Sequence, residues 1–124
     1  MTAVVDASVV LAWLQDEPGA DDAEPHLMDG VIGAANWSEV LQKSSQHGAP
    51  VGIVARLLVS FGLEVVDVTA EDAVLAAQLW RPAWSLSLGD RLCLALGLRL
   101  GLPVATADVA WQRVADGPEV IVIR

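Results

Sequence analysis

The chain has 124 residues, of which 54% are hydrophobic and 19% are charged, and its formal net charge is −9. This composition excludes a disordered chain and predicts one globular domain, residues 1–124, with a sizeable core. Asp90, Arg91 and Arg99 interrupt the longest apolar region, which leaves no run of the roughly 18 apolar residues that a membrane span needs. The lone cysteine, Cys93, and the lack of a basic, apolar leader predict a cytoplasmic protein without disulfides.

The acidic balance limits what can be inferred about partners. The chain has 16 Asp and Glu residues against 7 Lys and Arg residues. A nucleic-acid-binding surface is normally basic, but bound cations invert the local field of an acidic site. An acidic surface can also attract a basic protein. Charge alone therefore leaves both kinds of partner open.

Short β-branched runs alternate with helical segments along the chain. The opening run, Val4-Val5, ends at Asp6 and passes directly into a helical segment. Strands are predicted at 4–5, 31–34, 64–68, 103–106 and 120–123. Helices are predicted at 8–15, 36–46, 50–61, 70–80, 88–100 and 109–115. The alternation indicates a parallel sheet covered by helices on both faces.

The segment between the first helix and the second strand is strongly acidic. It contains Pro18-Gly19, and its acids are Asp16, Glu17, Asp21, Asp22, Glu24 and Asp29. We expect a solvated loop and face here, with a docking surface for a basic partner as the alternative.

Four acids lie just beyond a strand or in the first turn of the helix that follows. They are Asp6, Glu39, Asp90 and Asp108. Ligands bind at the carboxyl edge of open α/β sheets. Carboxylates gathered there, with no Lys or Arg beside them, would raise one another's pKa unless a divalent cation lay among them. Oxygen ligands suit Mg²⁺ and Mn²⁺, and such sites commonly hydrolyse phosphodiesters.

Each of these acids also has a purely structural explanation. Single N-caps, and pairs with the spacing of a capping box, are predicted at Asp6, Asp108, Asn36/Glu39 and Ser87/Asp90. Acids in a first helical turn are also favoured by the helix dipole. Thr69 and Asp72 have the same spacing, and we assign them no chemistry. The four acids therefore indicate a site only if the fold brings them together.

Four segments resemble the signatures of a known family. In chain order they are Val4-Val5-Asp6-Ala7-Ser8, Asn36-Trp37-Ser38-Glu39-Val40, Ser87-Leu88-Gly89-Asp90 and Pro103-Val104-Ala105-Thr106-Ala107-Asp108. Their order and spacing resemble those of PIN domains, and most closely the VapC-type ribonuclease toxins of bacterial toxin–antitoxin pairs. The resemblance covers nearly the whole chain.

The resemblance implies a three-layer α/β/α fold whose parallel sheet of about five strands has the order 3-2-1-4-5. It further implies an endoribonuclease that depends on Mg²⁺ or Mn²⁺. The acids that would hold the metal and carry the catalysis are Asp6, Glu39, Asp90 and Asp108. Ser8 and Thr106 occupy positions where hydroxyls support such a site, although each also suits a cap. Glu71 and Asp72 would lie remote from it, near the edge strand.

The same resemblance implies an RNA substrate, a VapB-like antitoxin and a homodimer. Position 109 is Val, where relatives often have a basic residue after the last acid. Contacts to RNA phosphates would then come from the few available groups, such as Lys43, Arg81 and Arg91, or from a second subunit.

Two alternatives remain at this stage. A phospho-accepting receiver domain has a similar length and sheet, but it needs a lysine near the end of its fifth strand, and Lys43 is the only lysine. A catalytically silent PIN-like module that captures a protein partner would be marked by a missing acid, and none is missing. The low number of bases nevertheless keeps this second alternative open.

Overall fold

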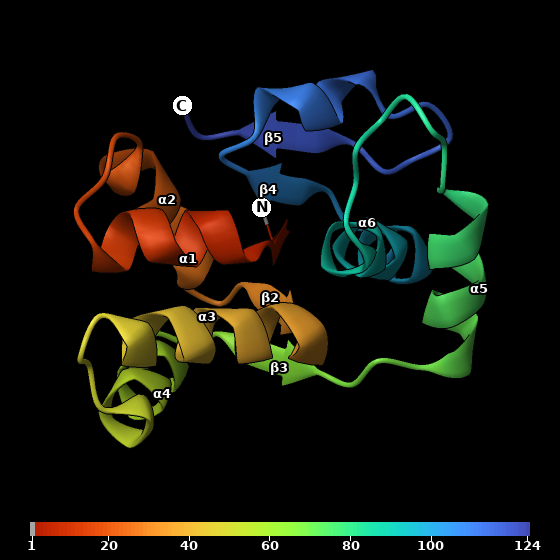
Figure 1. Ribbon diagram of the computed structural model, residues 1–124. Coiled ribbons are helices and arrows are strands. Elements are labelled where there is room, and N and C mark those ends of the chain that lie inside the picture. Colours follow the sequence, from red (N-terminus) through yellow and green to blue (C-terminus); the bar gives the residue numbers. More distant parts are fainter. Residues whose placement is uncertain (1) are drawn as a thin grey trace.

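The structure is a computed structural model that describes residues 2–124. Strands and helices alternate along most of the chain (Figure 1). The strands are β1 (Val4–Val5), β2 (Val31–Gly33), β3 (Glu64–Val66), β4 (Val104–Thr106) and β5 (Val120–Val122). The helices are α1 (Ala7–Leu14), α2 (Ala20–Leu27), α3 (Ala34–Gln46), α4 (Val51–Ser60), α5 (Ala70–Gln78), α6 (Leu88–Leu100) and the 3₁₀ helix η1 (Val109–Arg113).

The five strands form one parallel sheet in the order β3-β2-β1-β4-β5. Val4 of β1 pairs with Val31 on one side and with Val104 on the other. The chain therefore adds strands outward from β1 in one direction and then returns to add β4 and β5 in the other. This arrangement confirms the predicted α/β fold and strand order. It also makes the carboxyl ends of β1 and β4 the switch point of the sheet, where a crevice is expected.

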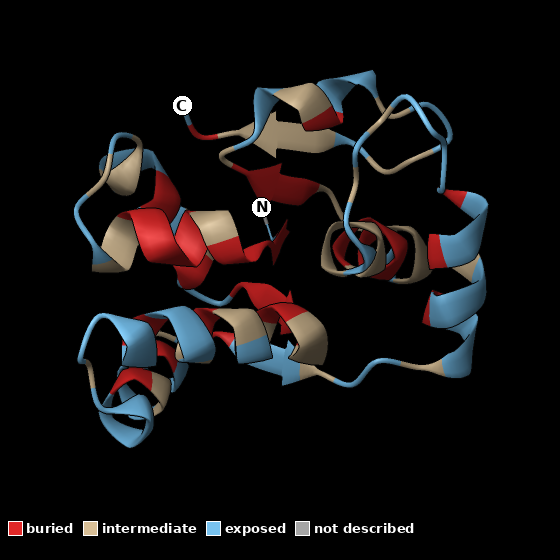
Figure 2. Ribbon diagram, viewed as in Figure 1, coloured by how far each residue is buried: buried red, intermediate tan, exposed pale blue. Residues whose placement is uncertain are grey.

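Alternating side chains of the central strands enter two separate cores. Val5, Ile32 and Ala105 pack under α1, α2, α3 and α4, whereas Val4 and Val104 pack under α5, α6 and η1. Figure 1 shows the two helical layers on opposite sides of the sheet, and Figure 2 shows that the inner strands are buried while β3 is largely exposed. These are the three layers that the resemblance implied.

The acidic segment after α1 is not the loop that the sequence predicted. Residues Ala20–Leu27 form α2, which begins after Gly19 in a left-handed conformation (φ 94°). Asp21 and Asp22 lie in its first turn, where the helix dipole favours negative charge. Only Ala23 and Leu27 of this helix are buried. An apolar stripe of two residues, with a proline at position 25, was too weak a pattern to indicate a helix.

The predicted cap at Asn36 is also wrong. Helix α3 begins at Ala34, and its N-cap is Gly33, the last residue of β2, which makes no side-chain capping bond. Because β2 runs into α3 without a loop, Asn36 falls inside the first turn and is buried. Its Nδ2 donates to the carbonyl of Gly89, 3.3 Å away, and so links α3 to α6.

Helix α6 has the predicted bounds and lies deep in the second core. Its Cys93 is fully buried, and burial raises the pKa of this thiol well above its usual value. The thiol therefore behaves as a small apolar side chain. Within residues 2–124, none of the helices combines the length and apolar character needed to cross a membrane.

Candidate active site

Asp6 occupies the switch point between β1 and α1. It is the N-cap of α1, where Oδ1 accepts a hydrogen bond from the backbone N–H of Val9 at 3.2 Å. The hydroxyls of Ser8 and Thr106 donate to its two carboxylate oxygens at 2.5 and 2.8 Å. Burial raises the pKa of Asp6 to about 6, because these hydrogen bonds offset only part of the desolvation. The negative charge of Asp90 adds a smaller increase.

Ser8 and Thr106 join the ends of β1 and β4. While donating to Asp6, the Ser8 hydroxyl accepts from the backbone N–H of Ala107 at 2.9 Å. The Thr106 hydroxyl likewise accepts from the backbone N–H of Asp108 at 3.1 Å. Each hydroxyl thus uses its single proton on Asp6 and one lone pair on the β4–η1 turn. The network fixes the backbone of Asp108 relative to the carboxylate of Asp6.

Asp90 and Asp108 are helix caps and also line the same pocket as Asp6. Asp108 Oδ1 accepts from the N–H of Ala110 at 2.9 Å at the start of η1. Asp90 forms a full capping box with Ser87, with bonds of 3.0 and 3.1 Å. The predicted capping roles are therefore present, and they coexist with a position in the pocket. In Asp90 the box engages Oδ2 only.

Glu39, on α3, has a cation beside it, contrary to the sequence expectation. Its Oε2 lies 3.0 Å from Nζ of Lys43, one helical turn further along. Both side chains are about half exposed, so this is a surface pair of the i,i+4 kind. The i,i+4 spacing of Glu39 and Lys43 places both side chains on one face of α3, so the carboxylate is not isolated from positive charge.

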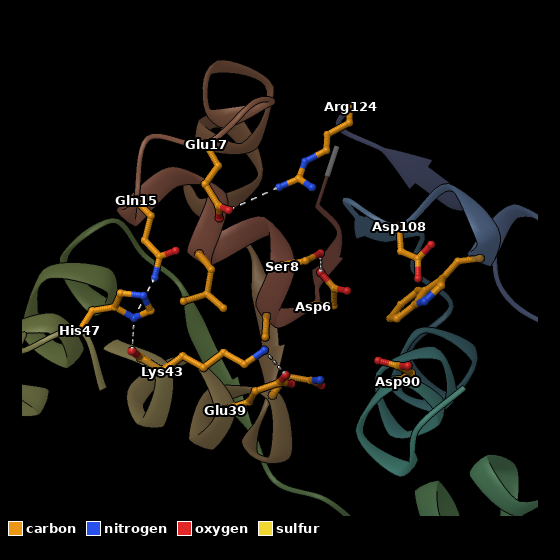
Figure 3. Close-up of a pocket in the computed structure, with 14 residues that line it drawn as sticks. Asp6, Ser8, Gln15, Glu17, Glu39, Lys43, His47, Asp90, Asp108 and Arg124 are labelled. Atoms are coloured by element: carbon orange, nitrogen blue, oxygen red, sulfur yellow. Dashed lines mark hydrogen bonds and ion pairs between the residues drawn. The ribbon is translucent and has the colours of Figure 1, made fainter. Parts of the chain in front are cut away.

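The four predicted acids line one pocket of about 350 Å³ at the carboxyl edge of the sheet (Figure 3). They reach it from four separate segments, which are the β1–α1 turn, α3, the start of α6 and the β4–η1 turn. Ser8 also lines the pocket, while Thr106 is fully buried beneath Asp6. The complete lining is Asp6, Ala7, Ser8, Leu11, Gln15, Glu17, Asn36, Glu39, Lys43, His47, Asp90, Asp108, Trp111 and Arg124.

Several polar side chains of this pocket were not predicted. Arg124, which follows β5, and His47, which follows α3, both contribute to its wall. Asn36 contributes an Oδ1 atom that is buried without a hydrogen-bond partner in residues 2–124. Lys43 was expected to contact RNA phosphates, but its pair with Glu39 was not predicted. No local pattern indicates Arg124, because only the parallel pairing of β5 with β4 brings it to this edge.

Two of the three bases proposed as phosphate ligands lie elsewhere. Arg81 donates to the carbonyls of Gln78 and Trp80, and Arg91 donates to the carbonyl of Ala76 at 3.0 Å. Neither side chain lines the pocket, whereas Lys43 does.

Asp72 lies outside the pocket. It forms a capping box with Thr69 on α5 and accepts from Arg99 of α6 at 2.6 Å. Burial opposes ionisation of this carboxyl, but the bonds from Arg99 and Thr69 outweigh it and hold its pKa below the usual value. The structural role expected for Asp72 agrees with these contacts.

The donor set of the pocket fits a hard divalent cation. Four carboxylates and the orphaned Oδ1 of Asn36 provide only oxygen ligands, as Mg²⁺ and Mn²⁺ require. The four acids line the same pocket, but their carboxylates do not form a preassembled cluster around one ion position. Among residues 2–124, no three His, Cys, Asp or Glu side chains form a group that could hold a metal ion as they stand.

The protein is thus an α/β domain with a parallel sheet in the order 3-2-1-4-5 and four acids at the switch point of that sheet, an arrangement known from nuclease domains. Residues 3–117 match the sequence profile of the PIN domain, so the chain belongs to the PIN domain family. No curated protein matches the sequence.

Solved structures show the same fold at low sequence identity. A chain of a toxin–antitoxin complex from Klebsiella pneumoniae has a TM-score of 0.77 at 20% identity, with 98% of each chain covered. A chain of a DNA-bound VapBC from Salmonella typhimurium has a TM-score of 0.76 at 17% identity, with 100% of each chain covered. VapC20 of Mycobacterium tuberculosis, described as a toxin that cleaves the sarcin–ricin loop, has a TM-score of 0.75 at 14% identity; 93% of this chain and 95% of that chain are covered.

Proposed function

We propose that the protein is a metal-dependent endoribonuclease and the toxin of a toxin–antitoxin pair. One observation carries this proposal: carboxylates from four separate segments line a single pocket at the switch point, and one of them, Asp6, is buried there with no cation from residues 2–124 at hydrogen-bonding distance. Such an arrangement costs stability and is typical of a functional site. Oxygen-only ligands in a pocket of this size suit a phosphodiester hydrolase.

In this proposal Asp6, Glu39, Asp90 and Asp108 hold Mg²⁺ or Mn²⁺. The bound ion supplies a more acidic water for attack on the phosphodiester and offsets the charge that develops on the phosphate. Ser8 and Thr106 act as positioning residues, because their hydroxyls fix both oxygens of Asp6. The capping bonds likewise fix Asp90 and Asp108 before an ion enters. These bonds orient three of the four carboxylates at the edge of the sheet, and the acids must still draw together around the ion, because among residues 2–124 no three of them form a ready metal site.

The choice of RNA as substrate and of an antitoxin as partner is supported by the proteins that share the fold. They include a sarcin–ricin-loop-cleaving toxin and chains of VapBC complexes. A VapB-like partner with a basic side chain would be complementary in charge to the acidic pocket. Homodimer formation and a cytoplasmic location stay predictions from the sequence.

The proposal is tested by incubating the purified protein with a mixed pool of structured RNA in Mg²⁺, Mn²⁺ or EDTA. We expect discrete cuts in the presence of either ion and none in EDTA. Asp6→Asn should abolish the cuts. Glu71→Gln, which neutralises an exposed acid outside the pocket, is the matched control and should cut like the parent.

Cuts that persist in EDTA or in Asp6→Asn would contradict a metal site at Asp6. If no ion supports cutting and the protein instead captures a basic protein tightly, the silent binding module becomes the better explanation.

A further inference from the structure

Two basic side chains line the pocket together with the four acids. Of the Lys and Arg side chains described, only Lys43 and Arg124 line it. Arg81, Arg91 and Arg99 are engaged with carbonyls or with Asp72 elsewhere. A chain of net charge −9 therefore brings two of its seven Lys and Arg residues to the one edge that carries the acids.

Arg124 is held in place but keeps donors for a ligand. Its Nε donates to the carbonyl of Pro18 at 2.9 Å, and its Nη2 lies 4.0 Å from Oε2 of Glu17. A guanidinium has five N–H donors in a planar fork. The backbone bond thus orients the group while the remaining donors face only a distant, exposed carboxylate.

Lys43 is similarly placed. Its contact with Glu39 is an exposed ion pair, and such pairs contribute only about 0–1 kcal/mol. A phosphate can therefore replace Glu39 as its partner at little cost, above all once Glu39 is engaged with a metal ion. His47 lies next to Lys43, with Nδ1 2.8 Å from the Lys43 carbonyl, and adds a hydrogen-bonding ring to the same wall.

Two of the pocket acids lie with the bases, Glu39 beside Lys43 and Glu17 beside Arg124, whereas Asp90 and Asp108 lie apart from both pairs. Figure 3 shows Asp90 and Asp108 on the right, Lys43 and His47 on the left, and Asp6 between them. Arg124 lies above Asp6, with its guanidinium directed toward Glu17. We call Lys43, His47 and Arg124 the basic arm.

We propose that the basic arm binds phosphates of the RNA strand that flank the phosphodiester that is cut, with Lys43 and Arg124 each holding one. This inference rests on the proposed nuclease function and assigns the part of the substrate that the acids cannot hold. The pocket has five acids, so an RNA backbone is repelled unless cations face it. Lys43 and Arg124 supply positive charge at the two flanking phosphates, with His47 as an additional donor, while the charge at the cut phosphate would come from the ion that the acids hold.

The test measures binding of a labelled, mixed-sequence single-stranded RNA in Mg²⁺, with Asp108→Asn as the parent so that the RNA stays intact. Each phosphate contact contributes about 0.7 to the slope of log affinity against log salt for a single strand. Lys43→Ala combined with Arg124→Ala should reduce the slope by about 1.4 and weaken binding roughly tenfold at low salt. Lys43→Arg should retain binding.

The matched control removes two other charges. Arg56→Ala combined with Arg113→Ala alters the net charge equally at residues outside the pocket, and it should change the slope little. In the cleaving protein, the Lys43/Arg124 variant should raise KM and leave kcat and the Mg²⁺ midpoint near their parent values. A shifted Mg²⁺ midpoint with an unchanged salt slope would show that Lys43 acts only by positioning Glu39 for the metal ion and does not contact RNA. That result would overturn the proposal.

The two hypotheses fail in different ways. If the unmodified protein cuts RNA but the Lys43/Arg124 variant binds and cuts with the parent's salt slope and KM, the basic arm is not a phosphate site and the nuclease proposal stands. If the unmodified protein neither binds nor cuts RNA, both proposals are wrong.

Discussion

Two buried acids of this molecule have opposite surroundings. Asp6 and Asp72 are 6% and 2% exposed, each lies at the start of a helix, and each carboxylate accepts a backbone hydrogen bond, to which Asp6 adds two from hydroxyls. Asp72 also receives the guanidinium of Arg99, and its pKa falls below the usual value. Asp6 receives no cation from the described chain, and burial raises its pKa to about 6.

Under the proposed function, this difference separates a structural acid, Asp72, from a metal-binding one, Asp6. An arginine side chain paired with Asp6 would offset the cost of burying this carboxylate, as Arg99 does for Asp72. It would also occupy the position of the proposed metal ion. Among residues 2–124, Asp6 instead accepts hydrogen bonds from hydroxyl and backbone donors only. These bonds fix the position of the carboxylate without neutralising its charge. If Asp6 binds a metal ion, an unfavourable free energy of burying its charged carboxylate in the absence of the ion is expected.

The largest effect expected from this comparison is on catalysis. Asp6→Asn should lower RNA cleavage on the order of a thousandfold, because it removes a carboxylate from the proposed metal site. Asp72→Asn should cleave at close to the parent rate at temperatures where it is folded. Initial rates in saturating Mg²⁺ measure both. Equal losses in the two variants would show that Asp6 is merely structural.

The second prediction concerns the pH dependence of stability without metal. Asp6 has a folded pKa of about 6 against 3.8 in the reference state, so the folded protein binds more protons between these values. The contribution of Asp6 is therefore most favourable below about pH 4 and is lost as the pH rises to about 6, by up to about 3 kcal/mol. Relative to Asp6→Asn, the parent should become less stable across this window.

Urea unfolding of both proteins in EDTA, at steps from pH 4 to 7, checks this sign. The difference in unfolding free energy between Asp6→Asn and the parent should grow with pH. A difference that is constant, or that shrinks, would show that the carboxyl of Asp6 is stabilised in its charged form. Mg²⁺ should reduce the difference at pH 7, because binding to the folded state stabilises it.

The third prediction reverses that sign at Asp72. Because the pKa of Asp72 is lowered in the folded state, its contribution is present above about pH 4 and is lost as the pH falls. Asp72→Asn should cost about 2 kcal/mol at pH 7, since Arg99 loses its partner but remains partly exposed to water. The cost should decline toward pH 3 in the same urea experiment. If the loss of unfolding free energy in Asp72→Asn does not depend on pH, it arises from the capping box with Thr69 and not from the ion pair with Arg99.

The sequence predicted the fold well for identifiable reasons. Short β-branched strands, caps at Thr69 and Ser87, and the helix over 88–100 are local signals, and the structure confirms each of them. The order of the strands came from the family resemblance. Helix α2 was missed because its buried stripe is only Ala23 and Leu27.

The site was only partly predictable because its decisive contacts are not local. Asp72 and Asp90 have the same capping-box spacing, and both boxes form. What separates them is Arg99 beside Asp72 and the sheet edge beside Asp90, and neither can be read from the helix start alone. Arg124 has no motif around it, and only the pairing of β5 with β4 brings it to the pocket.

The smallest predicted effect distinguishes the two ion pairs. Lys43→Ala breaks the exposed pair with Glu39 and should change the unfolding free energy by less than about 0.5 kcal/mol, in contrast to the loss at Asp72. Thermal unfolding at low and high salt provides the measurement, with Arg56→Ala on α4 as control. A loss comparable to that of Asp72→Asn would make Lys43 a structural residue. A negligible loss leaves its ammonium free to exchange Glu39 for a phosphate, as the basic arm requires.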